Sequence, residues 1–185
     1  MEKTFKRKKL KTKPKTIVIT GAESTGKSVL TERLANYFQV PFIPEFARNY
    51  IERLNRKYDY SDVEYIARHQ VRELQENQNL SRPWIFADTW LIITKIWFEE
   101  VFEKCPKWLE AEIERTNIDL FLVCDTDLPW VADPVRENGG ERRSYLQNRY
   151  IETIQKYGFD YQIVSGQNDA RFENALQHLR QATGR

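Results

Sequence analysis

One octapeptide near the N-terminus constrains the fold more than any other part of this chain. Residues 21–28 read G-A-E-S-T-G-K-S, which matches the pattern G-x-x-x-x-G-K-[ST]. An apolar run at 16–20 directly precedes it, and residues 29–38 follow with apolar side chains at helical spacing. A strand, a glycine-containing loop and a helix N-terminus in this order direct backbone N–H groups at phosphate oxygens. The sequence therefore predicts a loop that binds a nucleoside triphosphate.

Two side chains of this loop have expected roles of their own. Lys27 is expected to reach the β- and γ-phosphates, and the Ser28 hydroxyl is expected to bind Mg²⁺. The predicted cofactors are therefore ATP and Mg²⁺. The predicted nucleotide contacts in the loop are Gly21, Ala22, Glu23, Ser24, Thr25, Gly26, Lys27 and Ser28.

Length and composition predict an ordinary globular domain. The 185 residues suffice for one domain, and 41% hydrophobic with 30% charged residues is typical of a globular protein. There is no apolar run of membrane-spanning length and no secretory signal pattern, so we expect no membrane partner. Cys105 and Cys124 lack the spacing of a metal or redox motif. These features favour a cytoplasmic protein.

The basic charge is concentrated at the N-terminus. Residues 1–15 contain eight of the 29 basic residues and one of the 27 acidic residues, so the remainder is mildly acidic. A basic segment can bind nucleic acid, but this one has Phe5 as its lone aromatic residue. We therefore expect a disordered arm at 1–15, with nucleic acid an unlikely partner, and a single domain at 16–185. The sequence does not predict an oligomeric state.

Strand and helix patterns alternate along the whole domain. The strands are nearly continuous apolar runs, which is typical of a parallel sheet covered on both faces. The predicted fold class is therefore α/β, a P-loop NTPase with about five parallel strands and helices on both faces. A capping box at Ser61 and Glu64 is expected to begin the third helix. The expected strands are 16–20, 40–44, 84–87, 120–124 and 161–164, and the expected helices are 29–38, 46–54, 61–80, 89–102, 106–115, 141–157 and 169–181.

Two carboxylates follow predicted strands, at the edge where parallel sheets bind ligands. Asp88 is expected to bind Mg²⁺ or to accept the proton of an acceptor hydroxyl, although it could instead cap the following helix. Glu45 is the alternative base, and its other possible role is to stabilise the helix that it precedes. The sequence does not decide between the two carboxylates.

Cations and aromatic rings complete the candidate site. Segment 130–143 has the glycines and arginines of a lid, and Arg136 is its favoured phosphate ligand over Arg142 and Arg143. Arg48 is a further candidate, although an exposed helix face would explain it equally well. Tyr50, Trp90 and Trp130 lie beyond strand ends, where a ring could stack on a base or pyridine, or simply pack in the core.

Missing motifs narrow the class of protein. The chain lacks N-K-x-D for guanine recognition and a D-x-x-G switch after the loop. Thr89 follows Asp88, where motor-type ATPases have a glutamate that activates water. These absences disfavour a GTPase switch and an AAA-type machine, and a small-molecule kinase remains.

An ordered set of motifs resembles a known family. The loop, P-E-F-A-R at 44–48, Asp88-Thr89, and W-V-A-D at 130–133 with Arg136 resemble the ribosylnicotinamide kinase domain of NadR-type proteins over 16–180. The resemblance implies ATP-dependent phosphorylation of the 5′-hydroxyl of nicotinamide riboside to nicotinamide mononucleotide, within NAD biosynthesis. The expected catalytic residues are Lys27, Asp88, Glu45 and Arg136, and the expected substrate contacts are Glu45, Arg48, Tyr50, Asp88, Trp90, Trp130 and Asp133.

This chain departs from the family in two ways. NadR proteins typically fuse this domain to a nucleotidyltransferase and often to a DNA-binding domain, so we expect a stand-alone kinase without those activities. The family pattern has a second acid where this chain has Trp90. Kinase activity on another nucleoside-like acceptor therefore stays open. A non-catalytic ATP-binding regulator is the alternative outside the enzymes.

Overall fold

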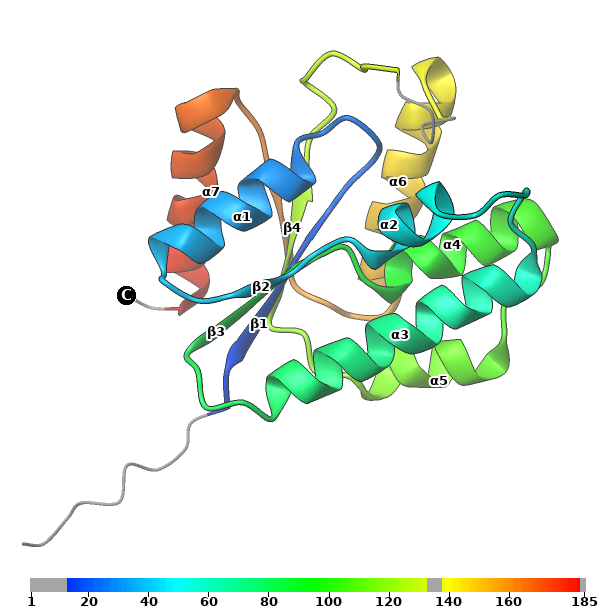
Figure 1. Ribbon diagram of the computed structural model, residues 1–185. Helices are drawn as coiled ribbons and strands as arrows, with labels where there is room; N and C mark the ends of the chain where they lie inside the picture. Colours follow the sequence, from blue (N-terminus) through cyan, green and yellow to red (C-terminus); the bar gives the residue numbers. More distant parts are fainter. Residues whose placement is uncertain (1–12, 133–137, 184–185) are drawn as a thin grey trace, which may run out of the picture.

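The fold is a five-stranded parallel sheet enclosed by helices (Figure 1). The computed structural model describes residues 13–132 and 138–183, and these counts refer to that part of the chain. The strands are β1 (Lys15–Thr20), β2 (Phe42–Ile43), β3 (Trp84–Asp88), β4 (Leu120–Cys124) and β5 (Tyr161–Val164). The helices are α1 (Lys27–Tyr37), α2 (Phe46–Glu52), α3 (Tyr60–Gln78), α4 (Leu91–Phe102), α5 (Lys107–Arg115), α6 (Gly140–Lys156) and α7 (Asn168–Thr183).

The strand order explains why the motifs meet. The order is β2-β3-β1-β4-β5, so the strand before the loop is central and pairs with β3 and β4. All pairs are parallel, which brings the carboxyl ends of the strands to one edge. The predicted α/β P-loop fold with helices on both faces is confirmed.

Two hydrophobic clusters pack on the two faces of the sheet. One cluster lies between the sheet and helices α1 and α7, and the other lies between the sheet and helices α3 to α6. Side chains alternate between these faces along each strand. In β3, Phe86 belongs to the α1 cluster and Ala87 to the opposite cluster. The next residue, Asp88, therefore points to the face that carries α1.

Several element boundaries differ from the predicted ones for local reasons. The predicted Ser61–Glu64 capping box is wrong, because Asp59 is the N-cap of α3 and pairs reciprocally with Asp62. Lys15 belongs to β1 and not to the predicted arm, most of which lies outside the described residues. Thr89 is not helical, and α4 begins two residues later than predicted.

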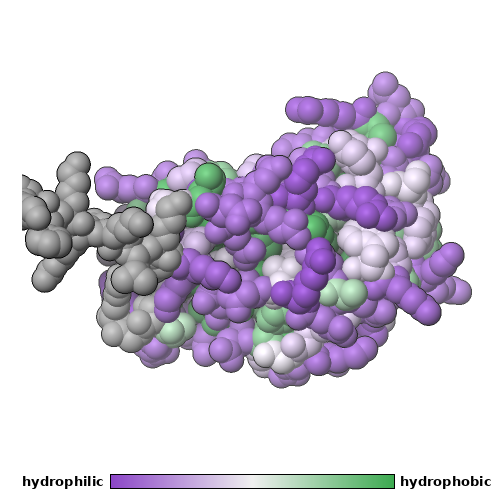
Figure 2. Space-filling model, turned by 90° about the horizontal axis from the view of Figure 1, so that it is seen from below, coloured by the Kyte–Doolittle hydropathy of each residue, from purple (hydrophilic) through white to green (hydrophobic). Residues whose placement is uncertain are grey.

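The surface is what the composition predicts for a globular domain. The face at which β1 begins is mainly hydrophilic, with hydrophobic side chains in small separate areas (Figure 2). None of the helices in the described part of the chain combines the length and apolar character that crossing a bilayer requires.

Candidate active site

The predicted phosphate loop connects β1 to α1, and its two glycines are required by geometry. Gly21 has φ 133°, and a Cβ there would lie 2.6 Å from the Cys124 carbonyl oxygen. Gly26 is the N-cap of α1 in the left-handed region, with φ 76°. Helix α1 therefore begins at Lys27 with its first N–H groups facing the loop, as an anion site requires.

Lys27 lies over the loop. Its Nζ donates a hydrogen bond of 2.8 Å to the carbonyl oxygen of Ala22, which also accepts from the Thr25 hydroxyl at 2.8 Å. The ammonium group is therefore held on the inner side of the loop. A phosphate chain lying along the loop would meet this charge.

Asp88 and Glu45 lie together beside the loop. Burial and, next, repulsion from Glu45 raise the pKa of the Asp88 carboxyl to about 6, while the Ser28 side chain, Lys27 and Arg48 oppose this rise. The Asp88 side chain is almost fully buried, and its Oδ1 has no hydrogen-bond partner in the described part of the chain. Neither carboxylate caps a helix with its side chain. The N-cap of α4 is Trp90 and not Asp88, and Glu45 is the N-cap residue of α2 but makes no side-chain hydrogen bond there.

The donor set suits a magnesium ion. Ser28 supplies a hydroxyl, and Asp88 supplies a buried carboxylate oxygen without a partner among the described residues. Mg²⁺ at nucleotide sites typically takes one or two carboxylates together with phosphate oxygens and water. In the described ranges, no three His, Cys, Asp or Glu side chains come together as a metal site. A Mg²⁺ site that takes one carboxylate from the protein is compatible with this finding.

Helix α6 supports the loop from outside through Arg143 and Gln147, which the sequence analysis did not assign to this role. The Arg143 guanidinium donates to the carbonyl oxygens of Glu23 (2.8 Å) and Ser24 (3.0 Å) in the loop. It also donates to Leu128 O (2.8 Å) and Thr126 O (3.3 Å) after β4. The loop and the segment after β4 are therefore joined by one buried side chain.

Gln147 lies one turn further along α6 and makes a second bridge. Its Oε1 accepts from Ala22 N at 2.8 Å, and its Nε2 donates to Cys124 O at 2.9 Å. A signal for this pair was present in the sequence, because Arg143 and Gln147 share a helix face with Leu146 and Tyr150, which are buried. Polar residues on a buried helix face require polar partners.

The loop also holds both flanks of residues 133–137. The Glu23 carboxylate accepts from the backbone N (3.0 Å) and Nδ2 (2.8 Å) of Asn138 and from Trp130 Nε1 (3.4 Å). Ser24 Oγ exchanges hydrogen bonds with the backbone of Val131. The Trp130 ring lies against Gly139, where a Cβ would come within 3.2 Å of it. The predicted contacts Asp133 and Arg136 lie outside the described residues.

The other candidate substrate residues occupy different places. Arg48 is near Glu45 (4.0 Å) and pairs with Glu52 (3.2 Å), and it acts on the Asp88 carboxyl electrostatically. Tyr50 donates its hydroxyl to Asp62 at 2.9 Å, which ties α2 to α3. Arg48 therefore lies at the carboxylate pair, whereas the Tyr50 hydroxyl is engaged in the fold.

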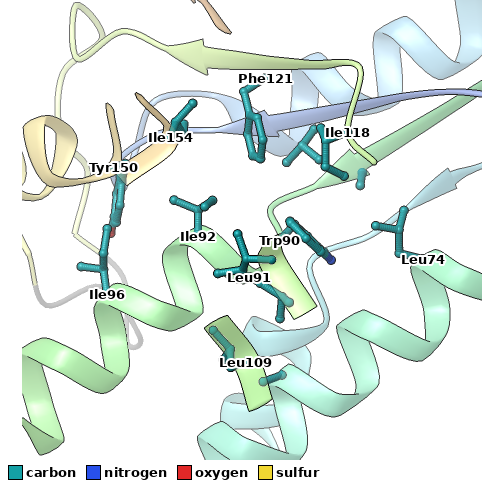
Figure 3. Packing of buried hydrophobic residues seen from close by; sticks show 14 of the residues in the cluster. Leu74, Trp90, Leu91, Ile92, Ile96, Leu109, Ile118, Phe121, Tyr150 and Ile154 are labelled. Carbon is teal, nitrogen blue, oxygen red and sulfur yellow. The ribbon is translucent and has the colours of Figure 1, made fainter. Parts of the chain in front are cut away.

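The structure does not place the Trp90 ring in an open site. The side chain is 2% exposed and packs with Leu91, Ile92 and Leu74 in the cluster under α3 and α4 (Figure 3). Of the two alternatives that the sequence left open for this ring, the structure therefore shows core packing and not a stacking platform. The cause lies in the backbone of the preceding residue, Thr89, which has φ 66°.

The loops after β4 and β5 are fixed to each other by a buried arginine. Arg171 of α7 donates to Val164 O (3.0 Å) and Gly166 O (2.8 Å) and forms an ion pair with Asp127. Asp127 also accepts from Gly166 N at 2.6 Å. The segment after β4 is also joined to the phosphate loop, through Arg143.

Several solved structures share this architecture. A NadR protein in complex with NR matches with a TM-score of 0.80 and 24% identity over 93% of this chain and 52% of that chain. A NadR protein with NAD and AMP-PNP gives 0.73 and 22%, covering 93% and 50%. Deoxyadenosine kinase from M. mycoides with bound dATP gives 0.62 and 16%, covering 90% and 99%. The fold and the loop therefore define a protein of the P-loop kinase fold.

Sequence comparison identifies the family. A family model described as an AAA domain matches residues 16–171, which is most of the chain, and the chain belongs to this family. The trifunctional NAD biosynthesis/regulator protein NadR of Escherichia coli (strain K12) is 27% identical over 176 residues, and that of Salmonella typhimurium is 26% identical. The matches cover 92% of this chain and 43% of each relative, so the chain spans less than half of their length. The predicted resemblance to NadR-type proteins is confirmed. The family model is named after AAA domains, but this chain has Thr89 at the position where motor-type ATPases have a glutamate.

Proposed function

We propose that this protein is an ATP-dependent kinase that phosphorylates the 5′-hydroxyl of nicotinamide riboside in NAD biosynthesis. The observation that carries the proposal is the pair of carboxylates, Asp88 and Glu45, beside a loop that presents Lys27 and Ser28. This arrangement provides a phosphate cradle, a metal ligand and a proton acceptor within one site. The similarity to NadR proteins, one of them solved with NR, supports the choice of acceptor. We place this activity in the cytoplasm, where ATP is available.

Asp88 and Glu45 have different roles in this proposal. Asp88 interacts with Ser28, so these two residues would hold Mg²⁺, which supplies charge neutralisation on the β- and γ-phosphate oxygens when it is bound. Glu45 is about one third exposed and lies beside Arg48, so it is accessible to an entering hydroxyl. Glu45 would therefore accept the hydroxyl proton.

The proposed reaction balances with these groups alone. The 5′-oxygen of the acceptor forms a bond to the γ-phosphorus of ATP, and the bond from that phosphorus to the β,γ-bridging oxygen breaks. ADP leaves, and the acceptor proton passes to Glu45. Lys27 would stabilise the negative charge that spreads over the transferred group and the leaving oxygen.

Another nucleoside as acceptor is the second candidate. The structural match to a deoxyadenosine kinase extends over 99% of that chain, and Trp90 replaces the second acid of the NadR pattern. A panel of nicotinamide riboside, ribonucleosides and deoxynucleosides, assayed by ADP release, separates these acceptors. We expect nicotinamide riboside to stimulate ADP release above basal hydrolysis. Binding of ATP without stimulation by any acceptor would favour a non-catalytic regulator.

Variants test the division of roles. Lys27→Ala is expected to abolish stimulated ADP release, whereas Lys156→Ala, at an exposed position at the end of α6, serves as its matched control. Glu45→Gln is expected to lower kcat by about 10²-fold or more with an unchanged Mg²⁺ requirement. Asp88→Asn is expected to raise the Mg²⁺ concentration for half-maximal activity. The opposite pattern would assign the proton to Asp88.

A further inference from the structure

A small cavity adjoins the candidate active site. It lies between helix α3 and the ends of β2 and β3, and its wall includes Asp88 and Pro44, the residue before Glu45. The cavity has room for about one water-sized group. A single polar group of a bound acceptor could therefore enter it, close to the hydroxyl that Glu45 and Asp88 would face.

The edge of the Trp90 ring supplies a buried hydrogen-bond donor to this wall. The ring packs in the core, but its Nε1 atom is buried and has no hydrogen-bond partner in the described part of the chain. Trp90 and Leu74 both line the cavity, and the nitrogen end of the ring is directed to the side on which Leu74 lies (Figure 3). Buried polar groups normally have a partner, so this N–H group next to a cavity indicates a ligand.

Two side chains of α3 give the cavity further polar groups. Gln70 is almost completely buried, and its Oε1 accepts a hydrogen bond from the Thr94 hydroxyl at 2.7 Å, which leaves its Nε2 as the amide end for the cavity. Glu73 also lines the cavity and is about one quarter exposed, so it lies where the cavity meets solvent. The remaining wall is largely apolar, and it therefore strengthens the requirement that each polar group finds a partner.

These polar groups match the hydrogen-bonding capacity of a hydroxyl group. A hydroxyl oxygen accepts from two donors and its proton is donated once. Trp90 and Gln70 offer the two N–H donors, and the Glu73 carboxylate offers the acceptor. A carbonyl oxygen would have no proton for Glu73, and an amide nitrogen cannot accept from Trp90. In a nucleoside, hydroxyls of this kind are carried by the sugar ring, which also bears the 5′-carbon.

We propose that Trp90 is a specificity-determining residue, whose indole N–H donates to one ring hydroxyl of the acceptor's ribose while Glu73 accepts a hydrogen bond from that hydroxyl. This inference rests on the proposed function, because it requires a nucleoside acceptor at Glu45 and Asp88. It gives a role to the position at which this chain departs from the NadR pattern. An acid at position 90 would accept a hydrogen bond from a hydroxyl, whereas an indole only donates one.

The kinetic test uses nicotinamide riboside and its 2′-deoxy and 3′-deoxy analogues as acceptors. We expect the wild type to lose about 30-fold or more in kcat/KM with one of the two analogues, because its buried polar groups are then left unpaired. In Trp90→Phe this ratio should fall at least about fivefold, since the contact is already lost with the parent riboside. Trp84→Phe shortens a buried indole in the opposite cluster and should keep the wild-type ratio. Equal use of all three ribosides by the wild type, or an unchanged ratio in Trp90→Phe, would overturn the proposal.

A second variant tests the cavity from its exposed side, where a substitution disturbs the core less. Glu73→Met should reduce the same ratio by about threefold or more, because the hydroxyl loses its acceptor. Glu76→Met, at an exposed position of the same helix, is the matched control and should leave the ratio unchanged. A general loss of structure would lower the activity on all three ribosides together, so an unchanged ratio in Glu73→Met contradicts the proposal.

Calorimetric titration with the same three ribosides in the presence of AMP-PNP detects the contact without turnover. We expect weaker binding of the analogue that is also the poorer acceptor. Equal affinities for the three ribosides, or binding of none of them, would overturn the inference. If the wild type binds the ribosides but transfers phosphate to none, the proposed function fails, and the titration still decides whether Trp90 and Glu73 hold a sugar hydroxyl.

Discussion

Replacing Arg143 by methionine tests whether α6 holds the phosphate loop in place. The substitution keeps most of the side-chain volume and removes the donors to four backbone carbonyl oxygens. Hydrogen bonds from a charged donor contribute about 1.5–3 kcal/mol each, but water can reach the freed carbonyls and will offset part of this. We therefore expect a loss of about 3 kcal/mol in the free energy of unfolding, which corresponds to a lower melting temperature by roughly 6–12 °C.

The neighbouring arginine is the matched control. Arg142 is exposed on the same helix and pairs with Glu100 at 2.7 Å, so Arg142→Met should cost less than about 1 kcal/mol. Urea unfolding and thermal scans of both variants measure the difference, and ATP titration should show weaker binding in Arg143→Met alone. If the two variants lose the same stability and bind ATP equally, the Arg143 contacts do not support the loop.

Two further substitutions address the loop and the carboxylate. Gly21→Ala should destabilise the fold and abolish ATP binding, because the new Cβ would lie 2.6 Å from Cys124 O. The control is Gly158→Ala, where φ is 72° and nothing lies within 4 Å of the new Cβ. It should lower the free energy of unfolding by about 1–2 kcal/mol and leave ATP binding intact. Equal effects on ATP binding would contradict the predicted geometry. Because the pKa of Asp88 is raised to about 6 in the folded state, its contribution to stability is full below pH 4 and is lost as the pH rises through 6. In EDTA, the free energy of unfolding of Asp88→Asn relative to wild type should therefore rise by about 2 kcal/mol as the pH increases from about 4.5 to 8. If this difference stays constant across the range, the pKa of Asp88 is not raised.

Features that depend on local sequence were predictable. The strand, the glycine loop and the helix start are adjacent in the chain, and parallel strands must bring Glu45 and Asp88 to the same edge. The sequence therefore predicted both carboxylates at the edge that carries Lys27 and Ser28, and the structure places them there. Their catalytic roles remain predictions.

Features that depend on distant partners or unusual backbone were not predictable. The helix face of Arg143 indicates that this side chain needs polar partners, but the sequence does not show which ones, because they are backbone carbonyl oxygens about 120 positions earlier in the chain. Core packing of Trp90 was one of the alternatives that the sequence left open, but the left-handed backbone of Thr89 that precedes it has no signature in the sequence.

The position of the transferred phosphate decides whether this protein is a 5′-kinase of nicotinamide riboside. The wild-type protein is incubated with Mg²⁺, ATP and nicotinamide riboside, and the products are separated and examined by mass spectrometry and ³¹P NMR. We predict ADP and nicotinamide mononucleotide in equal amounts, with the phosphate on the 5′-oxygen, and neither product above background with Lys27→Ala. Unmodified nicotinamide riboside beside inorganic phosphate, or phosphate transfer to a different nucleoside alone, would contradict the account.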